Sequence, residues 1–184
     1  MERKPYCGRG WRVKLGQSLV ALACCAAITL AAETIPSTEA ENLLGQKINI
    51  AGSLKGKVGV LLLGFSHASG TNVGVWEKRL AQDYGADAQV VTYQMPILES
   101  VPHLVRGMMS SGMRKDIPKE KQANFLLVYH DEDKWKQVCG YQKSDDAFIV
   151  LVDKTGEVRW HGSGDGKLGS YTTLHQQIQL LLVQ

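Results

Sequence analysis

The stretch that decides the fold is LLLGFSHASGTNVGVWEKRL, Leu61 to Leu80. It continues an apolar run over residues 57–65, which predicts a central strand buried on both faces of its sheet. After a short polar loop, Val73, Trp76 and Leu80 recur at helical spacing. The stretch therefore predicts a buried strand that leads through a loop into an amphipathic helix.

Small and polar residues mark the ends of this helix. Thr71 or Asn72 can cap its N-terminus, and Gly85 can end it. This places the residues before Thr71 in the loop, with Ser66 and His67 next to the strand. The loop then lies at the carboxyl end of a central strand, where open α/β sheets bind their ligands.

The rest of the chain alternates strand and helix patterns. The expected elements are strands at residues 87–96 and 124–131, helices from residue 101 and at 133–141, a hairpin at 147–162 and a closing helix at 171–184. This order predicts right-handed crossovers and a largely parallel sheet, to which the terminal hairpin adds an antiparallel pair. The expected fold class is α/β, a three-layer sandwich around a mixed sheet. A loop at residues 162–170 precedes the closing helix.

Residues 1–32 have the pattern of a leader. Basic residues precede an apolar run from Leu19 to Leu30 and two small residues, which is the layout of a secretory signal peptide. We expect cleavage after Ala31 or Ala32 and an exported protein, periplasmic or extracellular. An uncleaved membrane anchor is the alternative, because the apolar run is close to the length that spans a bilayer.

Removing the leader changes the charge of the remaining chain. The leader holds five of the 21 basic and one of the 18 acidic residues, so 16 and 17 remain, a formal charge of −1. The remaining chain has no basic stripe, so nothing predicts nucleic-acid binding. Membrane contact is expected only through the N-terminal segment, if it stays uncleaved. Residues 33–56 are expected to form a polar lead-in, with a short strand or hairpin at 46–50, and residues 57–184 the domain.

Three segments carry a resemblance to a known fold. VGVLLLGFS (58–66), KWKQVCGY (134–141) and FIVLVDKTGEVRW (148–160) resemble the thioredoxin-like superfamily, in particular its peroxiredoxin and TlpA-type branch. With HGSG (161–164), the third segment also resembles the mitochondrial ATP synthase assembly-factor family, which has a thioredoxin-like fold as well. The resemblance implies a thioredoxin-like sandwich whose redox site would lie in the loop after the first central strand.

Both halves of that redox site are missing. No cysteine lies between Phe65 and Trp76, although attack on a disulfide or peroxide needs a thiolate. Asp146 and Ala147 stand where thioredoxins have a cis-proline. We therefore interpret the chain as a redox-inactive member of the superfamily, and we predict no cofactor and no metal site.

Two classes of function stay open. The first is an exported binding or assembly protein for an envelope protein or peptide. Its binding patch is expected at the carboxyl end of the sheet, on Ser66, His67, Ser69, Thr71, Asp146 and Ala147. The alternative is a thiol-dependent oxidoreductase or peroxidase that uses Cys139, the only cysteine after the leader. A carrier of a metal or a small ligand is a third hypothesis.

Overall fold

The computed structural model describes residue 1, residues 33–166 and residues 168–184. The predicted signal peptide, its cleavage site and the cysteines at positions 7, 24 and 25 lie outside the described residues. From residue 33 onward the described chain belongs to one compact unit. Within the described part, no helix is long and apolar enough to cross a membrane.

The central sheet has its strands in the order β4-β3-β6-β7. β3 (Val58–Gly64) and β4 (Val90–Pro96) run parallel, β6 (Ala147–Val152) is antiparallel to β3, and β7 (Val158–Gly164) is antiparallel to β6. The mixed sheet confirms the predicted α/β class. The expectation of a largely parallel sheet is wrong, because β6 returns along β3 in the opposite direction. Every residue of β3 is buried, as its apolar run predicts.

A second sheet is built largely from the segment before the central strands, in the order β2-β1-β5. β1 (Glu39–Asn42) pairs antiparallel with both β2 (Lys47–Asn49) and β5 (Leu126–Leu127). Isolated parallel bridges on either side of β5 connect it to β4 and the residues just after β4. The strand expected at residues 46–50 is present as β2 and is followed by α1 (Ile50–Ser53). Residues 33–56 therefore fold with the rest of the compact unit.

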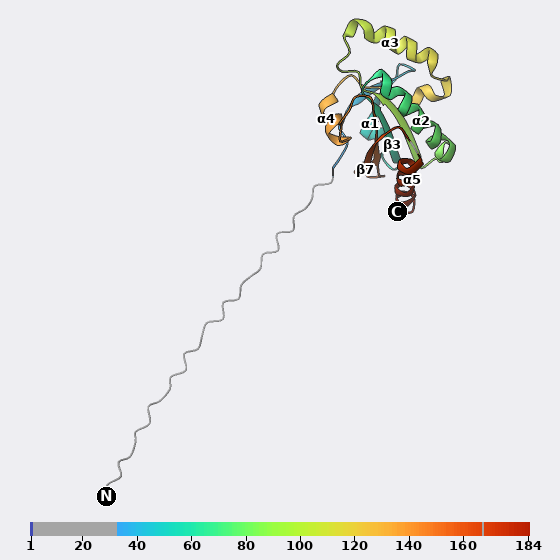
Figure 1. Cartoon of the computed structure of the whole chain (residues 1–184). Helices are drawn as coiled ribbons and strands as arrows, with labels where there is room; N and C mark the ends of the chain where they lie inside the picture. The colour runs from blue at the N-terminus through green and yellow to red at the C-terminus, as the bar shows by residue number, and fades with distance from the viewer. Residues whose placement is uncertain (2–32, 167) are drawn as a thin grey trace. The chain divides into compact units, whose positions relative to one another are not determined.

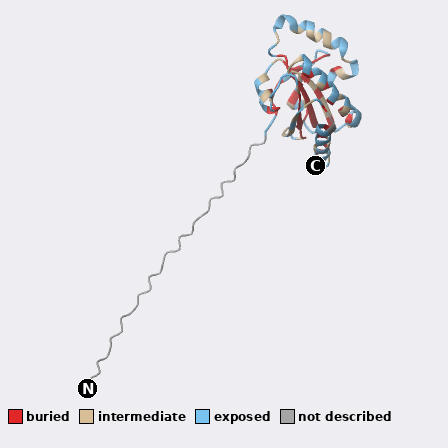
Figure 2. Ribbon diagram, viewed as in Figure 1, coloured by how far each residue is buried: buried red, intermediate tan, exposed pale blue. Residues whose placement is uncertain are grey.

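Helices cover both faces of the central sheet (Figure 1). α2 (His67–Tyr84) and α5 (Leu168–Leu182) bury Trp76, Leu80 and Ile178 against one face. α1 and α4 (Glu132–Val138) pack against the other face, where Trp135 lies in the core. β3 and β6 are buried along their whole length (Figure 2). This arrangement confirms the predicted three-layer sandwich.

α3 (His103–Asp116) and η1 (Lys119–Asn124) follow β4 and lie outside these layers. No residue of α3 is buried. Met109 and Met113 are partly buried against a small cluster formed by Leu43, Leu98, Phe125 and Leu127. The helix is therefore held on one side only, and its C-terminal end borders the pocket beside α2.

Two helices begin earlier than the sequence predicts. α2 begins at His67, with Ser66 as its N-cap, so Thr71 and Asn72 lie inside the helix. α5 begins at Leu168 and β7 continues to Gly164, so the loop expected at residues 162–170 is much shorter. Both stretches are rich in glycine and serine, which favour loops by composition. In α2 the capping box formed by Ser66 and Ser69 stabilises the earlier start. The predicted end of α2 at Gly85 is confirmed.

Candidate functional site

Two serines fix the N-terminus of α2. Ser66 Oγ accepts a hydrogen bond from the backbone N–H of Ser69 (3.1 Å), and Ser69 Oγ accepts one from the backbone N–H of Ser66 (3.1 Å). This reciprocal capping box satisfies two backbone donors and sets the direction in which the helix leaves β3. The side chain of Ser69 is fully buried, so its hydroxyl serves the cap.

The loop before β6 meets this helix end through Asp145. Its Oδ1 accepts a hydrogen bond from Ser66 Oγ (2.9 Å), and its carbonyl oxygen accepts one from Asn72 Nδ2 (3.1 Å). Sequence reasoning missed Asp145 as a contact and chose its neighbour Asp146. The pair of aspartates just ahead of an apolar strand was the available signal, but the sequence does not show which of the two faces the helix.

A pocket of about 380 Å³ opens beside the first turns of α2. The ends of β3 and β4 and the C-terminal end of α3 supply its other sides. Apolar side chains come from Leu62, Val73, Pro96, Met113, Ile117 and Phe125. Polar groups come from Ser66, His67, Thr71, Gln94 and Asp116. A cavity of this size, with apolar walls and a few polar groups, is suited to a side chain or a short segment of a ligand.

The structure brings together only part of the predicted binding patch. Three of its residues line the pocket, namely Ser66, His67 and Thr71. Asp146 is half-buried and Ala147 is fully buried at the start of β6, and the pocket is lined by neither. Binding at this patch stays a prediction, and Asp145 is the residue through which the loop before β6 contacts α2.

Two glycines leave the backbone of α2 bare toward the pocket. Gly70 and Gly74 both line it, and a Cβ atom added to either would meet no atom within 4 Å apart from the adjacent backbone of α2 itself. Glycine inside a helix costs about 0.5–1 kcal/mol relative to alanine. Packing within the domain therefore does not require these glycines, whereas a bare helix surface allows a ligand to approach the backbone closely.

Gly74→Ala is expected to raise the free energy of unfolding by up to about 1 kcal/mol, because the methyl group enters open space. Gly64→Ala is the contrasting variant, since its Cβ would lie 2.8 Å from Ser69 Oγ and displace the capping box. We expect it to lower the free energy of unfolding by about 1–3 kcal/mol. Urea denaturation of both variants measures the difference, and equal effects would contradict the packing of these two glycines.

The pocket and the helix end suit non-covalent binding. The N-terminus of α2 presents backbone N–H groups and the positive end of the helix dipole, with His67 and Thr71 beside it, so a carboxylate or a carbonyl could bind there. Among the described residues, no group of three or more His, Cys, Asp or Glu side chains could hold a metal ion.

Comparison with known proteins assigns the family. The family model described as ATP10 protein matches residues 30–181, most of the chain. The chain belongs to the ATP10 protein family. This match confirms the resemblance to the ATP synthase assembly family and points to an assembly-type role. A search of curated proteins finds no match.

Solved structures similar to this ATP10-family chain have the thioredoxin-like fold. The pneumococcal exposed lipoprotein thioredoxin Etrx1 from Streptococcus pneumoniae aligns with a TM-score of 0.54 and 15% identity, over 78% of this chain and 98% of that chain. BsSco, a member of the Sco family of cytochrome c oxidase assembly proteins, aligns with a TM-score of 0.56 and 12% identity, over 81% and 93%. A SCO1/SenC family lipoprotein from Bacillus anthracis aligns with a TM-score of 0.56 and 14% identity, over 83% and 96%. At these identities the likeness shows the fold alone.

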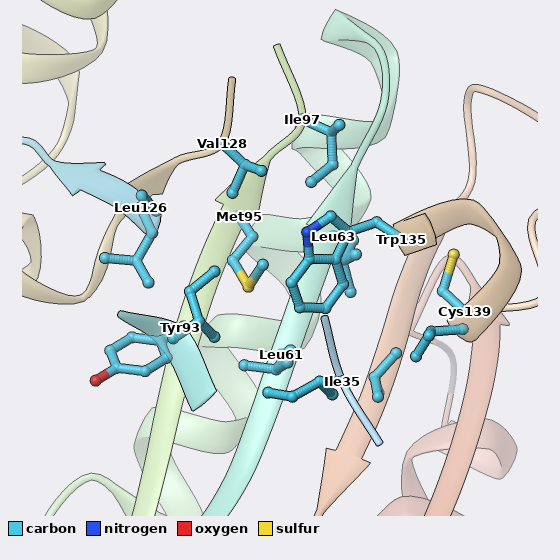
Figure 3. Packing of buried hydrophobic residues seen from close by; sticks show 14 of the residues in the cluster. Ile35, Leu61, Leu63, Tyr93, Met95, Ile97, Leu126, Val128, Trp135 and Cys139 are labelled. Atoms are coloured by element: carbon cyan, nitrogen blue, oxygen red, sulfur yellow. The ribbon is translucent and has the colours of Figure 1, made fainter. Parts of the chain in front are cut away.

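Cys139, the alternative redox residue, lies in the core of this ATP10-family domain. It follows α4, is 1% exposed, and lies in the same apolar cluster as Trp135, Leu63 and Met95 (Figure 3). Burial raises the pKa of its thiol to about 12. Because the thiolate is the reactive form, the burial of Cys139 and the raised pKa of its thiol both disfavour attack on a disulfide or a peroxide.

Cys139 is expected to resist alkylation by iodoacetamide at pH 8 in the native state and to react once the chain is unfolded in urea. The measurement uses the full chain with the three leader cysteines changed to serine, so that Cys139 is the only thiol. Mass spectrometry follows the modified fraction. Native-state alkylation as fast as that of a free thiol would favour the alternative function, a thiol-dependent oxidoreductase or peroxidase that uses Cys139.

Proposed function

We propose that this chain is an exported protein that assists the assembly of ATP synthase. It binds a protein partner and uses no thiol chemistry. The observation that carries the proposal is the end of the sheet at which β3, α2 and the loop before β6 meet. At that end Ser66 caps the N-terminus of α2, and its Oγ donates a hydrogen bond to Asp145 Oδ1. Beside it, the pocket between α2 and α3 offers apolar walls and a bare helix backbone. Family membership supports the assembly role.

The partner enters the pocket with an apolar side chain, and its backbone approaches α2 at Gly70 and Gly74. Ser66, His67 and Thr71 stand at the polar side of the pocket and bind its carbonyl or carboxylate groups. Ser69 and Ala147 are buried, so they support the patch from below, and Asp146 extends it beside Asp145. An assembly partner must be released again, and a shallow site with few charges suits such transient binding.

The leader delivers the domain across a membrane in this proposal. N-terminal sequencing of the mature protein, combined with cell fractionation, tests the delivery separately from the binding site. We expect a mature chain that begins at Ala32 or Glu33 in the exported fraction. A full-length chain in the membrane fraction would support the anchor instead, and a cytoplasmic or mitochondrial matrix location would overturn the exported location.

Filling the pocket tests the binding site. Gly74→Leu places a bulky side chain in open space on the pocket side of α2, so the domain is expected to fold. Affinity capture with the variant full chain should recover at least roughly tenfold less partner, as expected for a blocked central contact. Gly169→Leu on α5 is the matched control, because a Cβ there also meets no atom within 4 Å and the residue does not line the pocket.

The result that overturns this site is undiminished recovery of the same partner with Gly74→Leu. A loss with both variants would also count against it, because the effect would then be unspecific. Circular dichroism and the melting temperature of each variant establish that it is folded before the capture is compared.

A further inference from the structure

α3 is a helix without a buried residue. Its inward side chains, among them Met109 and Met113, are only partly buried against the small cluster that contains Leu43 and Phe125. In Figure 2 its ribbon is pale blue and tan along its whole length. The opposite side of the helix therefore faces away from the domain.

The outward side of α3 is apolar at its N-terminal half. Leu104 is 97% exposed and Met108, one turn later, is 72% exposed. Ser111 and Lys115 continue the same side at helical spacing, and both are exposed. We call Leu104, Met108, Ser111 and Lys115 the outer face of α3. A leucine and a methionine this exposed next to each other point to a surface that is covered when the protein works.

The charge of the chain is unevenly distributed around this helix. Residues 103–121 hold five basic and two acidic residues, a formal charge of +3. The remaining residues from Glu33 onward hold 11 basic and 15 acidic residues, a formal charge of −4. Arg106 donates to the carbonyl oxygens of Val101 and Glu99, so its positive charge is held at the start of α3. The overall balance of −1 after the leader thus conceals one basic region.

We propose that the outer face of α3 is a contact surface for a lipid bilayer with anionic headgroups. Leu104 and Met108 enter the boundary between headgroups and acyl chains, while Lys115 on the same face meets the headgroup charge. Arg106 and Arg114 donate to backbone carbonyls of the domain and add to the local positive charge without lying on this face. A bilayer accepts exposed apolar side chains on a projecting helix without a complementary pocket. Within the formal charge of +3, Lys121 is paired with Glu77, and the remaining positive charge complements an anionic surface. This contact is separate from the N-terminal segment, which is the one part of the chain where the sequence analysis expects membrane contact.

The contact orients the domain at the bilayer. One short helix with two apolar side chains binds a bilayer only weakly by itself. It therefore orients a domain that a second attachment holds near the membrane. Met113 and Ile117, on the inward side and just beyond the end of α3, line the pocket. With the outer face of α3 on the lipid, the pocket lies close to the bilayer surface.

Vesicle binding by the full chain tests the proposal. We compare vesicles of phosphatidylcholine alone with vesicles that contain phosphatidylglycerol as well. The double variant Leu104→Glu/Met108→Glu should lose binding to the anionic vesicles by roughly tenfold or more, because two apolar side chains leave the interface. The control is Leu180→Glu/Val183→Glu at the C-terminus, where the side chains are 54% and 83% exposed, and it should bind as the wild type. Lys115→Glu should weaken binding to the anionic vesicles only.

A tryptophan reporter on α3 detects contact of the helix with lipid even if the N-terminal leader causes most of the vesicle binding. Leu104→Trp should shift its fluorescence to shorter wavelength on anionic vesicles and be quenched by brominated lipid, whereas Leu180→Trp should show neither effect. The proposal is overturned if the Leu104→Trp signal is unchanged or if both reporters respond equally. It is also overturned if Leu104→Glu/Met108→Glu loses partner capture while vesicle binding is retained, because the outer face would then be a protein interface.

Discussion

Replacing Trp76 with alanine is expected to lower the free energy of unfolding by about 3–5 kcal/mol. The indole is fully buried between α2 and the central sheet, and its Nε1–H donates to the carbonyl oxygen of Gly164 (3.1 Å). Its ring centroid lies 6.1 Å from that of Tyr171 on α5. The truncation therefore leaves a cavity and removes the hydrogen bond to Gly164 at the point where α2, β7 and α5 meet.

Urea denaturation followed by circular dichroism measures the loss. Val75→Ala is the matched control, because Val75 neighbours Trp76 on α2 but is 38% exposed. Its effect should stay within about 0.5 kcal/mol. Trp76→Phe, which keeps most of the apolar area, should fall between the two. An unchanged denaturation midpoint for Trp76→Ala would contradict the packing of α2 on the sheet.

Asp153→Asn should lower the free energy of unfolding by about 2 kcal/mol at neutral pH. Asp153 is 6% exposed in the turn between β6 and β7 and accepts hydrogen bonds from the backbone N–H groups of Thr155 (2.8 Å) and Glu157 (3.1 Å). It also pairs with Arg159. Burial alone would raise the pKa of this carboxyl group, but the hydrogen bonds from Thr155, Arg159 and Glu157 outweigh it and lower the pKa from 3.8 to about 2.

The same carboxyl group gives the stability a defined pH dependence. Because its pKa is lower in the folded than in the unfolded state, the stabilisation is complete above about pH 4 and is lost as the pH falls toward 2. The wild type should therefore lose about 2 kcal/mol more than Asp153→Asn across this window. Glu39→Gln, at an exposed carboxylate of β1, is the control and should follow the wild type. Parallel curves for the wild type and Asp153→Asn would contradict the charge assigned to this turn.

Local patterns predicted the elements whose residues repeat at a fixed spacing. The apolar run of β3 and the spacing of Val73, Trp76 and Leu80 identified a buried strand and the buried side of α2. The turn Asp153 to Gly156 marked the β6–β7 hairpin, and Gly156 has a φ of 95°, which favours glycine there. Each of these signals acts between residues that are close in the sequence.

Contacts between distant segments explain most of what the sequence did not predict. The start of α2 depends on a reciprocal cap between Ser66 and Ser69. The surrounding stretch is rich in serine and glycine, so its sequence resembles that of a loop. Asp145 contacts the helix across 79 positions of sequence, so its role appears only in three dimensions. The pocket is likewise assembled from β3, α2, β4 and the end of α3, and no single segment carries its pattern.

An assembly function without a thiol can be measured as the amount of assembled ATP synthase in cells whose only copy of the protein carries Cys139→Ala. Cys139 is the single cysteine after the predicted leader, and alanine in its place removes the thiol without adding a polar group to the core. Native gel electrophoresis quantifies the complex, and the melting temperature of the purified variant shows that it is folded. We expect as much assembled enzyme as with the wild-type chain. A loss of the complex with a folded Cys139→Ala variant would contradict it.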